Sequence, residues 1–375
     1  MINKERMLAE FFELVKIKCS TTDERQVADL LKARLVALGM EVTEDNTGEK
    51  IGGNCGNVIA YAPGTVQGVA TIMLSAHMDC VEPCGGIEPQ LKDGIITSVG
   101  DTILGGDDKA GVVAILEALR IIKEKHIQHG PIQVLFTVAE EGGLNGAKHM
   151  DPSLLKADFG YALDSSGAPG EIIIMAPGQN NITAIIHGKK AHAGIAPEDG
   201  INAIVIAGQA LAAMTYGRID GETTANIGII NGGVATNIVP DRVEVHCEAR
   251  SRNMEKLAAQ TKHMKETFER VARENGARAE VNVQQSYGPY VLTEEAPVVA
   301  LAVAAAQSID LIPDVRATGG GSDANFFNNY GVPTAVLGVG MNKVHTADEY
   351  IKEVDLYNSA ELVIALIKTT IIMKK

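Results

Sequence analysis

The sequence predicts an α/β protein in which a mostly parallel sheet is interrupted by a smaller inserted domain. In the outer parts of the chain, apolar runs that favour strands alternate with stretches that favour helices, an order typical of a parallel sheet covered on both faces. The middle of the chain instead reads strand, helix, strand, strand, helix, strand, the order of a ferredoxin-like βαββαβ sandwich. With 375 residues, 46% of them apolar, the chain is long enough for two domains.

The outer elements can be followed along the chain. Residues 1–20 place apolar side chains at helical spacing, and residues 23–38 carry a helical apolar stripe that ends at Gly39. Strands are predicted at residues 57–62, 69–75, 132–138, 159–163 and 334–339, and a long helix at residues 109–125. Histidines or acidic residues follow several of these strands closely.

Five of these polar residues are of the types that bind metal ions. They are His77, Asp107, Glu141, Asp164 and His345. Ligands of open α/β sheets gather at the carboxyl ends of the strands, so residues far apart in sequence can meet there. Two imidazoles and three carboxylates are what two Zn²⁺ ions that share one bridging carboxylate require. A metallohydrolase is therefore the leading interpretation.

The inserted domain is expected at residues 179–290, which leaves residues 1–178 and 291–375 for the catalytic domain. Its strands and helices are predicted at 182–187, 200–216, 224–230, 242–250, 254–274 and 278–285. Pro177-Gly178 and Pro289 are the expected hinge points, because proline and glycine interrupt regular elements. None of the five candidate ligands falls inside this domain.

Composition narrows the class of partner and the compartment. Lys and Arg number 33 against 47 Asp and Glu, a net charge of −14 without a basic stretch, which disfavours nucleic acid and anionic membranes as partners. The first 20 residues lack the apolar centre of a signal peptide, and no apolar run reaches membrane-spanning length. Five thinly spread cysteines are expected to be free thiols. A cytoplasmic protein is expected.

The acidic pairs also have a purely structural interpretation. Asp107-Asp108 could only cap the helix that follows, and Glu140-Glu141 could be an exposed strand end. Taken singly, either pair favours that interpretation. Their joint occurrence with His77, Asp164 and His345 favours the metal site.

These motifs together resemble those of the M20 co-catalytic zinc peptidases, and most closely the peptidase T-like branch. The resemblance rests on His77-x-Asp79, Gly-Gly-Asp107-Asp-Lys-Ala-Gly, Glu140-Glu141-Gly, Asp164-Ser and His345, and it spans essentially the whole chain. It implies a zinc-peptidase catalytic domain and an inserted domain that acts as a lid or in dimerisation.

The resemblance also implies how the ligands are shared. Asp107 bridges two Zn²⁺ ions per subunit, His77 and Asp164 complete one site, and Glu141 and His345 complete the other; Co²⁺ or Mn²⁺ are conceivable substitutes. Their charge suits a bridging hydroxide. Asp79 accepts the other imidazole N–H of His77, and Glu140 is the general base.

Five further residues are implied as substrate contacts: His192, Asn237, Arg250, Gly320 and Ser322. His192 would donate a hydrogen bond to the oxyanion, and Arg250 would hold a substrate carboxylate. The run Gly319-Gly320-Gly321-Ser322-Asp323 lacks the lysine of a phosphate-binding loop and the arrangement around a nucleophilic serine. It is interpreted as a substrate-binding loop.

The expected function is a dinuclear zinc exopeptidase that acts on short peptides, with removal of the N-terminal residue of tripeptides as its specific form. A carboxypeptidase, a dipeptidase and an N-acyl-amino-acid amidohydrolase with the same metal centre remain alternatives. The chain departs from the tripeptidase pattern in two respects. Cys80 stands where threonine is common, and the segment from His77 to Asp107 is shorter than in a tripeptidase. A catalytically silent relative is disfavoured because every ligand and base position is filled. A homodimer through the inserted domain is a further expectation.

Overall fold

The computed structural model describes residues 2–372 and divides into two compact units. The first unit comprises the chain up to Ile174, Leu292–Ala317 and the chain from Ser322 onward. The second unit comprises Met175–Val291 and the short segment Thr318–Gly321. Sequence reasoning placed the inserted domain at 179–290, whereas in the structure β8 (Glu171–Ala176) runs across the first division and the segment 318–321 also groups with the second unit.

A nine-stranded sheet forms the centre of the first unit, although the residues of its edge strand β16 are counted in the second unit. Besides β8, its strands are β1 (Glu41–Glu44), β2 (Val58–Ala62), β3 (Ile72–His77), β6 (Ile132–Thr137), β7 (Phe159–Ser165), β16 (Tyr290–Val291), β17 (Asp314–Ala317) and β18 (Thr334–Gly338). Their order is β1-β2-β6-β3-β7-β18-β8-β16, with β17 beside β8. The four central strands β6, β3, β7 and β18 are parallel, and the flanking strands β1, β2, β8 and β16 pair antiparallel.

The parallel centre confirms the predicted fold class, and its burial explains why the sequence revealed it. Every residue of β3 and β6 is buried, as expected for strands with both faces covered. The antiparallel flanks were not anticipated, because an apolar run does not encode the direction in which its neighbour runs. Two of these central strands, β3 and β7, carry the predicted ligands His77 and Asp164.

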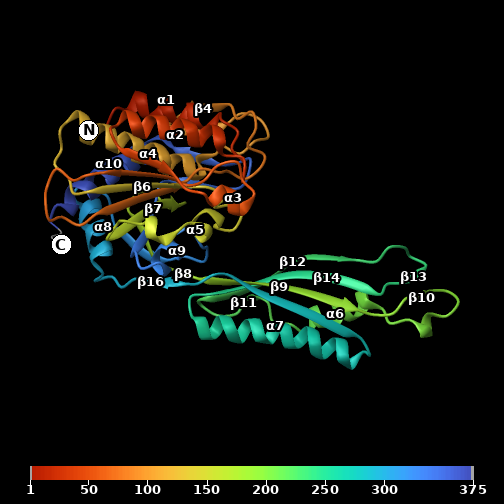
Figure 1. Cartoon of the computed structure of the whole chain (residues 1–375). Coiled ribbons are helices and arrows are strands. Elements are labelled where there is room, and N and C mark those ends of the chain that lie inside the picture. Colours follow the sequence, from red (N-terminus) through yellow and green to blue (C-terminus); the bar gives the residue numbers. More distant parts are fainter. Residues whose placement is uncertain (1, 373–375) are drawn as a thin grey trace. The chain divides into compact units, whose positions relative to one another are not determined.

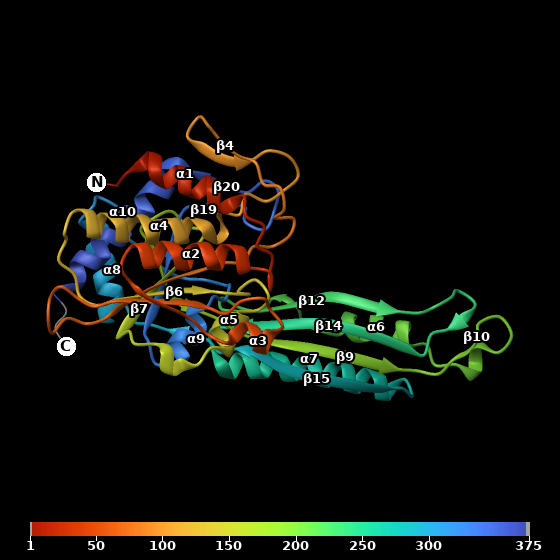
Figure 2. The same ribbon diagram turned by 45° about the horizontal axis from the view of Figure 1, so that its top comes forward.

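Helices cover both faces of this sheet. They are α1 (Lys4–Val15), α2 (Arg25–Ala37), α3 (Thr47–Ile51), α4 (Gly106–Glu124), α5 (Asn145–His149), α8 (Pro297–Gln307), α9 (Ala324–Asn329) and α10 (Glu353–Thr370), with a short 3₁₀ helix at Pro152–Leu154. In Figures 1 and 2, α1, α4 and α10 lie on one side of the sheet and α5 and α9 on the other. Met73 of β3 packs with Ala147 of α5 and Phe327 of α9, while α4 packs along β3 from the opposite face.

A small antiparallel sheet of four strands lies beside this core. Its strands are β4 (Pro89–Lys92), β5 (Ile95–Ser98), β19 (Met341–Asn342) and β20 (Tyr350–Lys352), in the order β19-β20-β5-β4. The loop between β19 and β20 carries His345. Pairing of β20 with β5 therefore fixes one end of a loop that belongs to the candidate site.

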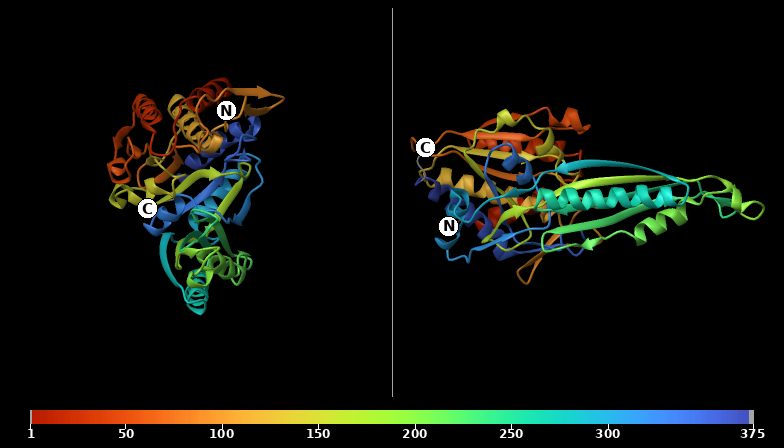
Figure 3. Two further views of the ribbon diagram at one scale, coloured as in Figure 1. Left: turned by 90° about the vertical axis from the view of Figure 1, so that its right-hand side faces the viewer. Right: turned by 90° about the horizontal axis from the view of Figure 1, so that it is seen from below.

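The second unit has the predicted ferredoxin-like fold. Its elements are β9 (Gly178–His187), β10 (Ala191–His192), α6 (Ala203–Ala212), β11 (Gly217–Arg218), β12 (Thr223–Gly232), β13 (Ile238–Val239), β14 (Arg242–Ser251), α7 (Met254–Glu274) and β15 (Arg278–Tyr287), with a short 3₁₀ helix at Pro197–Asp199. The antiparallel sheet has the order β11-β12-β14-β9-β15. Helices α6 and α7 pack on one face of it, as Figure 3 shows, around a core that includes Ile182, Val245 and Phe268.

Within residues 2–372, no helix combines the length and apolar character needed to cross a bilayer. All five cysteines are free, as expected from their number and spacing, and all five are buried.

Candidate metal centre

The register of the central strands brings the predicted residues together. His77 is the last residue of β3 and pairs with Thr137, the last residue of β6, so the Glu140-Glu141 turn begins beside it. Ser75 of β3 pairs with Ala162 of β7, which places Asp164 next to His77 two residues further along. The site thus lies at the carboxyl ends of parallel strands, where the alternation of strands and helices predicted it.

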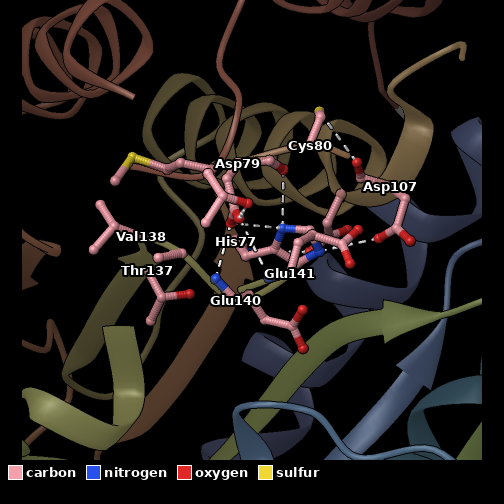
Figure 4. Close-up of polar contacts among 12 residues, drawn as sticks. His77, Asp79, Cys80, Asp107, Thr137, Val138, Glu140 and Glu141 are labelled. Carbon is pink, nitrogen blue, oxygen red and sulfur yellow. Dashed lines mark hydrogen bonds and ion pairs between the residues drawn. The ribbon is translucent and has the colours of Figure 1, made fainter. Parts of the chain in front are cut away.

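The carboxylate of Asp107 faces both histidines. Its Oδ1 is 3.0 Å from Nε2 of His77, and its Oδ2 is 3.3 Å from Nε2 of His345. Figure 4 shows Asp107 beside the His77 ring at the start of α4, where its backbone dihedrals are not helical. One carboxylate with each oxygen directed at a different imidazole is the arrangement that a bridging ligand requires.

The carboxylates of Asp164 and Glu141 each lie near a different histidine. Oδ1 of Asp164 is 3.8 Å from Nε2 of His77. Oε1 of Glu141 is 2.8 Å from Nε2 of His345, but this buried oxygen makes no hydrogen bond, so the two atoms are close without hydrogen-bond geometry. His77 is almost fully buried, whereas the His345 side chain is half exposed.

Asp108 joins this group although it was not predicted as a ligand. Its carboxylate lies within 4.8 Å of ligand atoms of His77 and Asp164, and a second group of the same kind consists of His77, Asp107 and Glu141. Both oxygens of Asp108 are already hydrogen-bonded, because Oδ1 accepts the N–H of Gly111 and Oδ2 accepts the N–H of His77. We therefore interpret Asp108 as the residue that caps α4 and ties it to β3. The capping interpretation of the Asp107-Asp108 pair thus applies to its second member.

Asp79 differs in detail from its predicted contact. The Nδ1 atom of His77 lies 3.1 Å from the backbone carbonyl of Asp79 and 3.5 Å from the carboxylate. The carboxylate instead accepts the N–H groups of Glu140 at 3.0 Å and Glu141 at 3.2 Å, and the hydroxyl of Thr21 at 2.7 Å. Asp79 therefore orients His77 through its main chain and holds the Glu140-Glu141 turn through its side chain.

The adjacent acids Glu140 and Glu141 have separate directions. Figure 4 shows the Glu141 side chain extending toward Asp107 and the Glu140 carboxyl group extending to a different side. Burial raises the pKa of Glu140 well above its usual range, and the charge of Asp164 adds to that rise. Glu140 thus combines a raised pKa with a carboxyl group that extends to a different side from that of Glu141.

Charged side chains from distant parts of the sequence lie close together around Asp107. The carboxylates of Asp107 and Glu141 beside the ring raise the pKa of His345 to about 10. Burial opposes protonation of His77, but hydrogen bonds to Asp107 and Asp79 hold its pKa well above its usual value. Burial also raises the pKa of Asp164. Buried carboxylates repel one another unless a positive charge lies between them.

The residues fit a pair of divalent metal ions. Two imidazole nitrogens and three carboxylates are the donor types that Zn²⁺ binds, and the unbonded buried Oε1 of Glu141 is a ligand atom without another use. His77 and Asp164 lie on one side of Asp107, and Glu141 and His345 on the other. The family resemblance implies this sharing, whereas the ligand atoms that lie within 4.8 Å of one another also place Glu141 with His77 and Asp107.

Two other buried polar residues near the site, Asp323 and Lys109, lie within the predicted motifs, but the sequence assigned them no role of their own. Asp323 accepts the hydroxyl of Thr137 at 2.5 Å, and its Oδ1 makes no hydrogen bond. Lys109, fully buried, donates to the carbonyl of Met78 and to the sulfur of Cys80. These contacts join segments that are far apart in sequence, so spacing alone could not reveal them.

The predicted substrate contacts fall in both units. His192, Asn237, Arg250 and Gly320 belong to the second unit, and Ser322 belongs to the first. The exposed ring of His192 lies in β10 beside β13, and the N–H of the next residue, Ala193, donates to the carbonyl of Asn237. His192 and Asn237 are therefore neighbours.

The remaining three contacts have local partners or a free group. Arg250 forms a two-pronged ion pair with Glu248. The N–H of Gly320 donates to the hydroxyl of Thr318. The hydroxyl of Ser322 is buried and makes no hydrogen bond.

Comparisons with known proteins agree with this geometry. The family model of peptidase family M20/M25/M40 matches residues 73–369. The uncharacterized protein YqjE of Bacillus subtilis is 45% identical over 368 residues, which cover 98% of this chain and 99% of that protein. Peptidase T of Geobacillus kaustophilus is 27% identical over 416 residues, which cover 97% and 98%.

Two solved structures are similar over nearly their whole length. Aminopeptidase PepT from Bacillus cereus has a TM-score of 0.92 at 48% identity, with 99% of both chains covered. A tripeptidase from Staphylococcus aureus has a TM-score of 0.96 at 43% identity, again with 99% of both chains covered.

Proposed function

Because the chain belongs to peptidase family M20/M25/M40, we propose that it is a dinuclear zinc exopeptidase that releases the N-terminal residue of short peptides, tripeptides in particular. One observation carries the dinuclear part: the two oxygens of Asp107 face two different histidines. The tripeptide part is supported by the similarity to proteins named aminopeptidase PepT and tripeptidase.

The ligands would be shared about Asp107. His77 and Asp164 would hold one ion, Glu141 and His345 would hold the other, and Asp107 would contact both. When bound, the two ions supply positive charge that lowers the pKa of water toward about 7 and polarises the peptide carbonyl. Asp79 fixes the orientation of His77 and of the turn that carries Glu141.

Glu140 is the general base of the proposed reaction. It takes a proton from the attacking water and returns it to the nitrogen of the leaving peptide. Its neighbour Glu141 binds metal, and the two tasks are compatible because the side chains extend in different directions (Figure 4).

Residues outside the metal centre would bind the peptide. His192 would donate to the oxyanion, and its neighbour Asn237, together with Gly320 and Ser322, would contact the substrate. Arg250 is now paired with Glu248, so a substrate carboxylate would have to share or displace that partner.

A tripeptide of three different residues tests the proposed direction of cleavage. We expect the zinc-loaded protein to release the first residue and leave the C-terminal dipeptide intact, as followed by mass spectrometry over time. Release of the third residue would show a carboxypeptidase instead. An untouched peptide, with cleavage of an N-acylated amino acid, would show an amidohydrolase.

We also propose a cytoplasmic homodimer assembled through the second unit. The five free cysteines suit a reducing compartment. Strand β12 pairs with the two-residue β11 only at Thr224 and Ala225, and Ile229 and Ile230 further along it are exposed. An exposed apolar edge strand favours pairing between subunits. Sedimentation of the purified protein tests this, and a monomer at micromolar concentration would contradict it.

A further inference from the structure

Glu349 is a buried acid that connects the two loops of the metal centre without being a ligand. It lies four residues after His345 and is 1% exposed. Its Oε2 accepts the N–H groups of Leu104 and Gly105, each at 2.8 Å, and its Oε1 accepts the N–H of Asp107 at 3.0 Å. Both oxygens are therefore directed at the segment that presents Asp107, and neither is left for a metal.

The segment 104–107 is built for this approach. Gly105 has φ +71°, a conformation that suits glycine. A Cβ atom on Gly106 would lie 3.0 Å from Oε1 of Glu349 and 2.6 Å from Cδ1 of Ile351. The two glycines before Asp107 thus leave room for the carboxylate to reach three backbone N–H groups of this segment.

The loop that carries His345 has two residues in the left-handed region of backbone conformation and hydrogen bonds of its own. Lys343 and His345 both have positive φ, 51° and 64°. Within the loop, the hydroxyl of Thr346 donates to the carbonyl of Lys343, and the N–H of Glu349 donates to the carbonyl of Thr346. Glu349 then passes directly into β20, which pairs with β5. It is therefore the point at which this exposed loop joins the buried core.

We propose that Glu349 is a positioning residue that sets the separation of Asp107 and His345, and with it the geometry of both metal sites. This inference rests on the proposed function, because it assigns Glu349 a task in a site that binds two ions. Hydrogen bonds from backbone N–H groups to a carboxylate are stronger than those between neutral groups. A site residue must also be held to within about 0.5 Å to work, which requires such support from behind.

The substitution Glu349→Gln tests whether this residue positions the metal ligands or only stabilises the fold. The side-chain amide keeps one acceptor oxygen, so the N–H of Asp107 or those of Leu104 and Gly105 lose their partner. We expect the affinity for Zn²⁺, measured by competition with a chelator, to fall by about 10- to 100-fold. The absorption spectrum of the Co²⁺-loaded variant should change, because it reports ligand geometry directly.

Glu117→Gln is the matched control. Glu117 is a fully buried acid of α4, the helix that also carries Asp107, and its carboxylate accepts hydrogen bonds from the N–H of Asn3 and the guanidinium of Arg6 at 2.8 Å each. It should lower the melting temperature without changing zinc affinity or the Co²⁺ spectrum. Glu349→Asp, which keeps the charge on a shorter side chain, should show a smaller loss of affinity and decides the case if Glu349→Gln does not fold.

The outcomes distinguish the inference from the proposed function. If the wild-type protein binds two ions and the folded Glu349 variants bind them with unchanged affinity and spectrum, Glu349 is not a positioning residue. If the variants and the Glu117 control lose affinity equally, the effect is one of stability and the inference is also overturned. If the wild-type protein itself binds no second ion, the proposed function fails first.

Discussion

Replacement of the Asp79 carboxylate tests most sharply how the Glu140-Glu141 turn is held in place. It accepts three hydrogen bonds, from the N–H groups of Glu140 and Glu141 and from the hydroxyl of Thr21. In Asp79→Asn, one oxygen can still accept from Glu140. The amide group then faces the N–H of Glu141, and two donors cannot bond to each other. The hydroxyl of Thr21 can rotate to accept, so its contact survives.

The expected magnitude follows from that count. One hydrogen bond to a charged group is lost and the partly buried N–H of Glu141 is left without this partner, which costs about 1.5–3 kcal/mol. If the whole of this energy raises the activation barrier, kcat falls by roughly 10- to 150-fold, at about 1.4 kcal/mol for each tenfold change in rate. KM should change little, because Asp79 does not contact the peptide in this account.

The assay is steady-state hydrolysis of a tripeptide with saturating zinc, together with the melting temperature of each variant. Thr21→Val is the matched control, since it removes the hydroxyl donor and keeps both acceptor oxygens for the turn; its kcat should stay within about threefold of wild type. A kcat for Asp79→Asn within about twofold of wild type would refute the reasoning.

Three further predictions concern the base, a ligand and a buried acid. Glu140→Gln should retain both metal ions and lose most turnover, since it removes the proton acceptor only; elemental analysis and kcat check this, and near-normal activity would exclude Glu140 as the base. His345→Ala should lower bound zinc from two equivalents to one, and a variant that still holds two would contradict that ligand set. Burial and the charge of Asp79 raise the pKa of Glu24 to about 7 from 4.5. The folded state therefore keeps a proton that the unfolded state loses between these values. This contribution to stability falls as pH rises from about 4.5 to 7, by about 3 kcal/mol. Glu24→Gln should remove that part of the pH dependence in urea unfolding, and an unchanged difference between pH 5 and pH 8 would contradict the shift.

Much of the site could be predicted because its ligands follow apolar strands. His77 closes β3 and Asp164 lies at the end of β7, and both strands are buried on either face, so their carboxyl ends had to meet. The βαββαβ unit was equally visible, because its order of elements is carried by local periodicity alone. Features that depend on the local pattern of apolar residues could therefore be predicted from the sequence.

What it missed depends on contacts between distant segments. Glu349 bonds to residues more than 240 positions earlier in the chain, and no spacing rule marks such a partner. Asp108 looked like an ordinary helix cap and is one, but it also holds the backbone of His77. Asp79 was expected to bond His77 through its carboxylate, whereas the nearer acceptor is its backbone carbonyl. The carboxylate of Asp79 is used instead by the N–H groups of Glu140 and Glu141, which are distant in sequence.

The central claim is that Asp107 bridges two metal ions. Crystals grown with zinc and measured at the zinc absorption edge test it directly, because anomalous peaks locate each ion without reference to activity. The account predicts two peaks about 3.5–4 Å apart on either side of Asp107, one near His77 and Asp164 and the other near Glu141 and His345. A single peak at full zinc loading, or two peaks of which one lies away from Asp107, would contradict it.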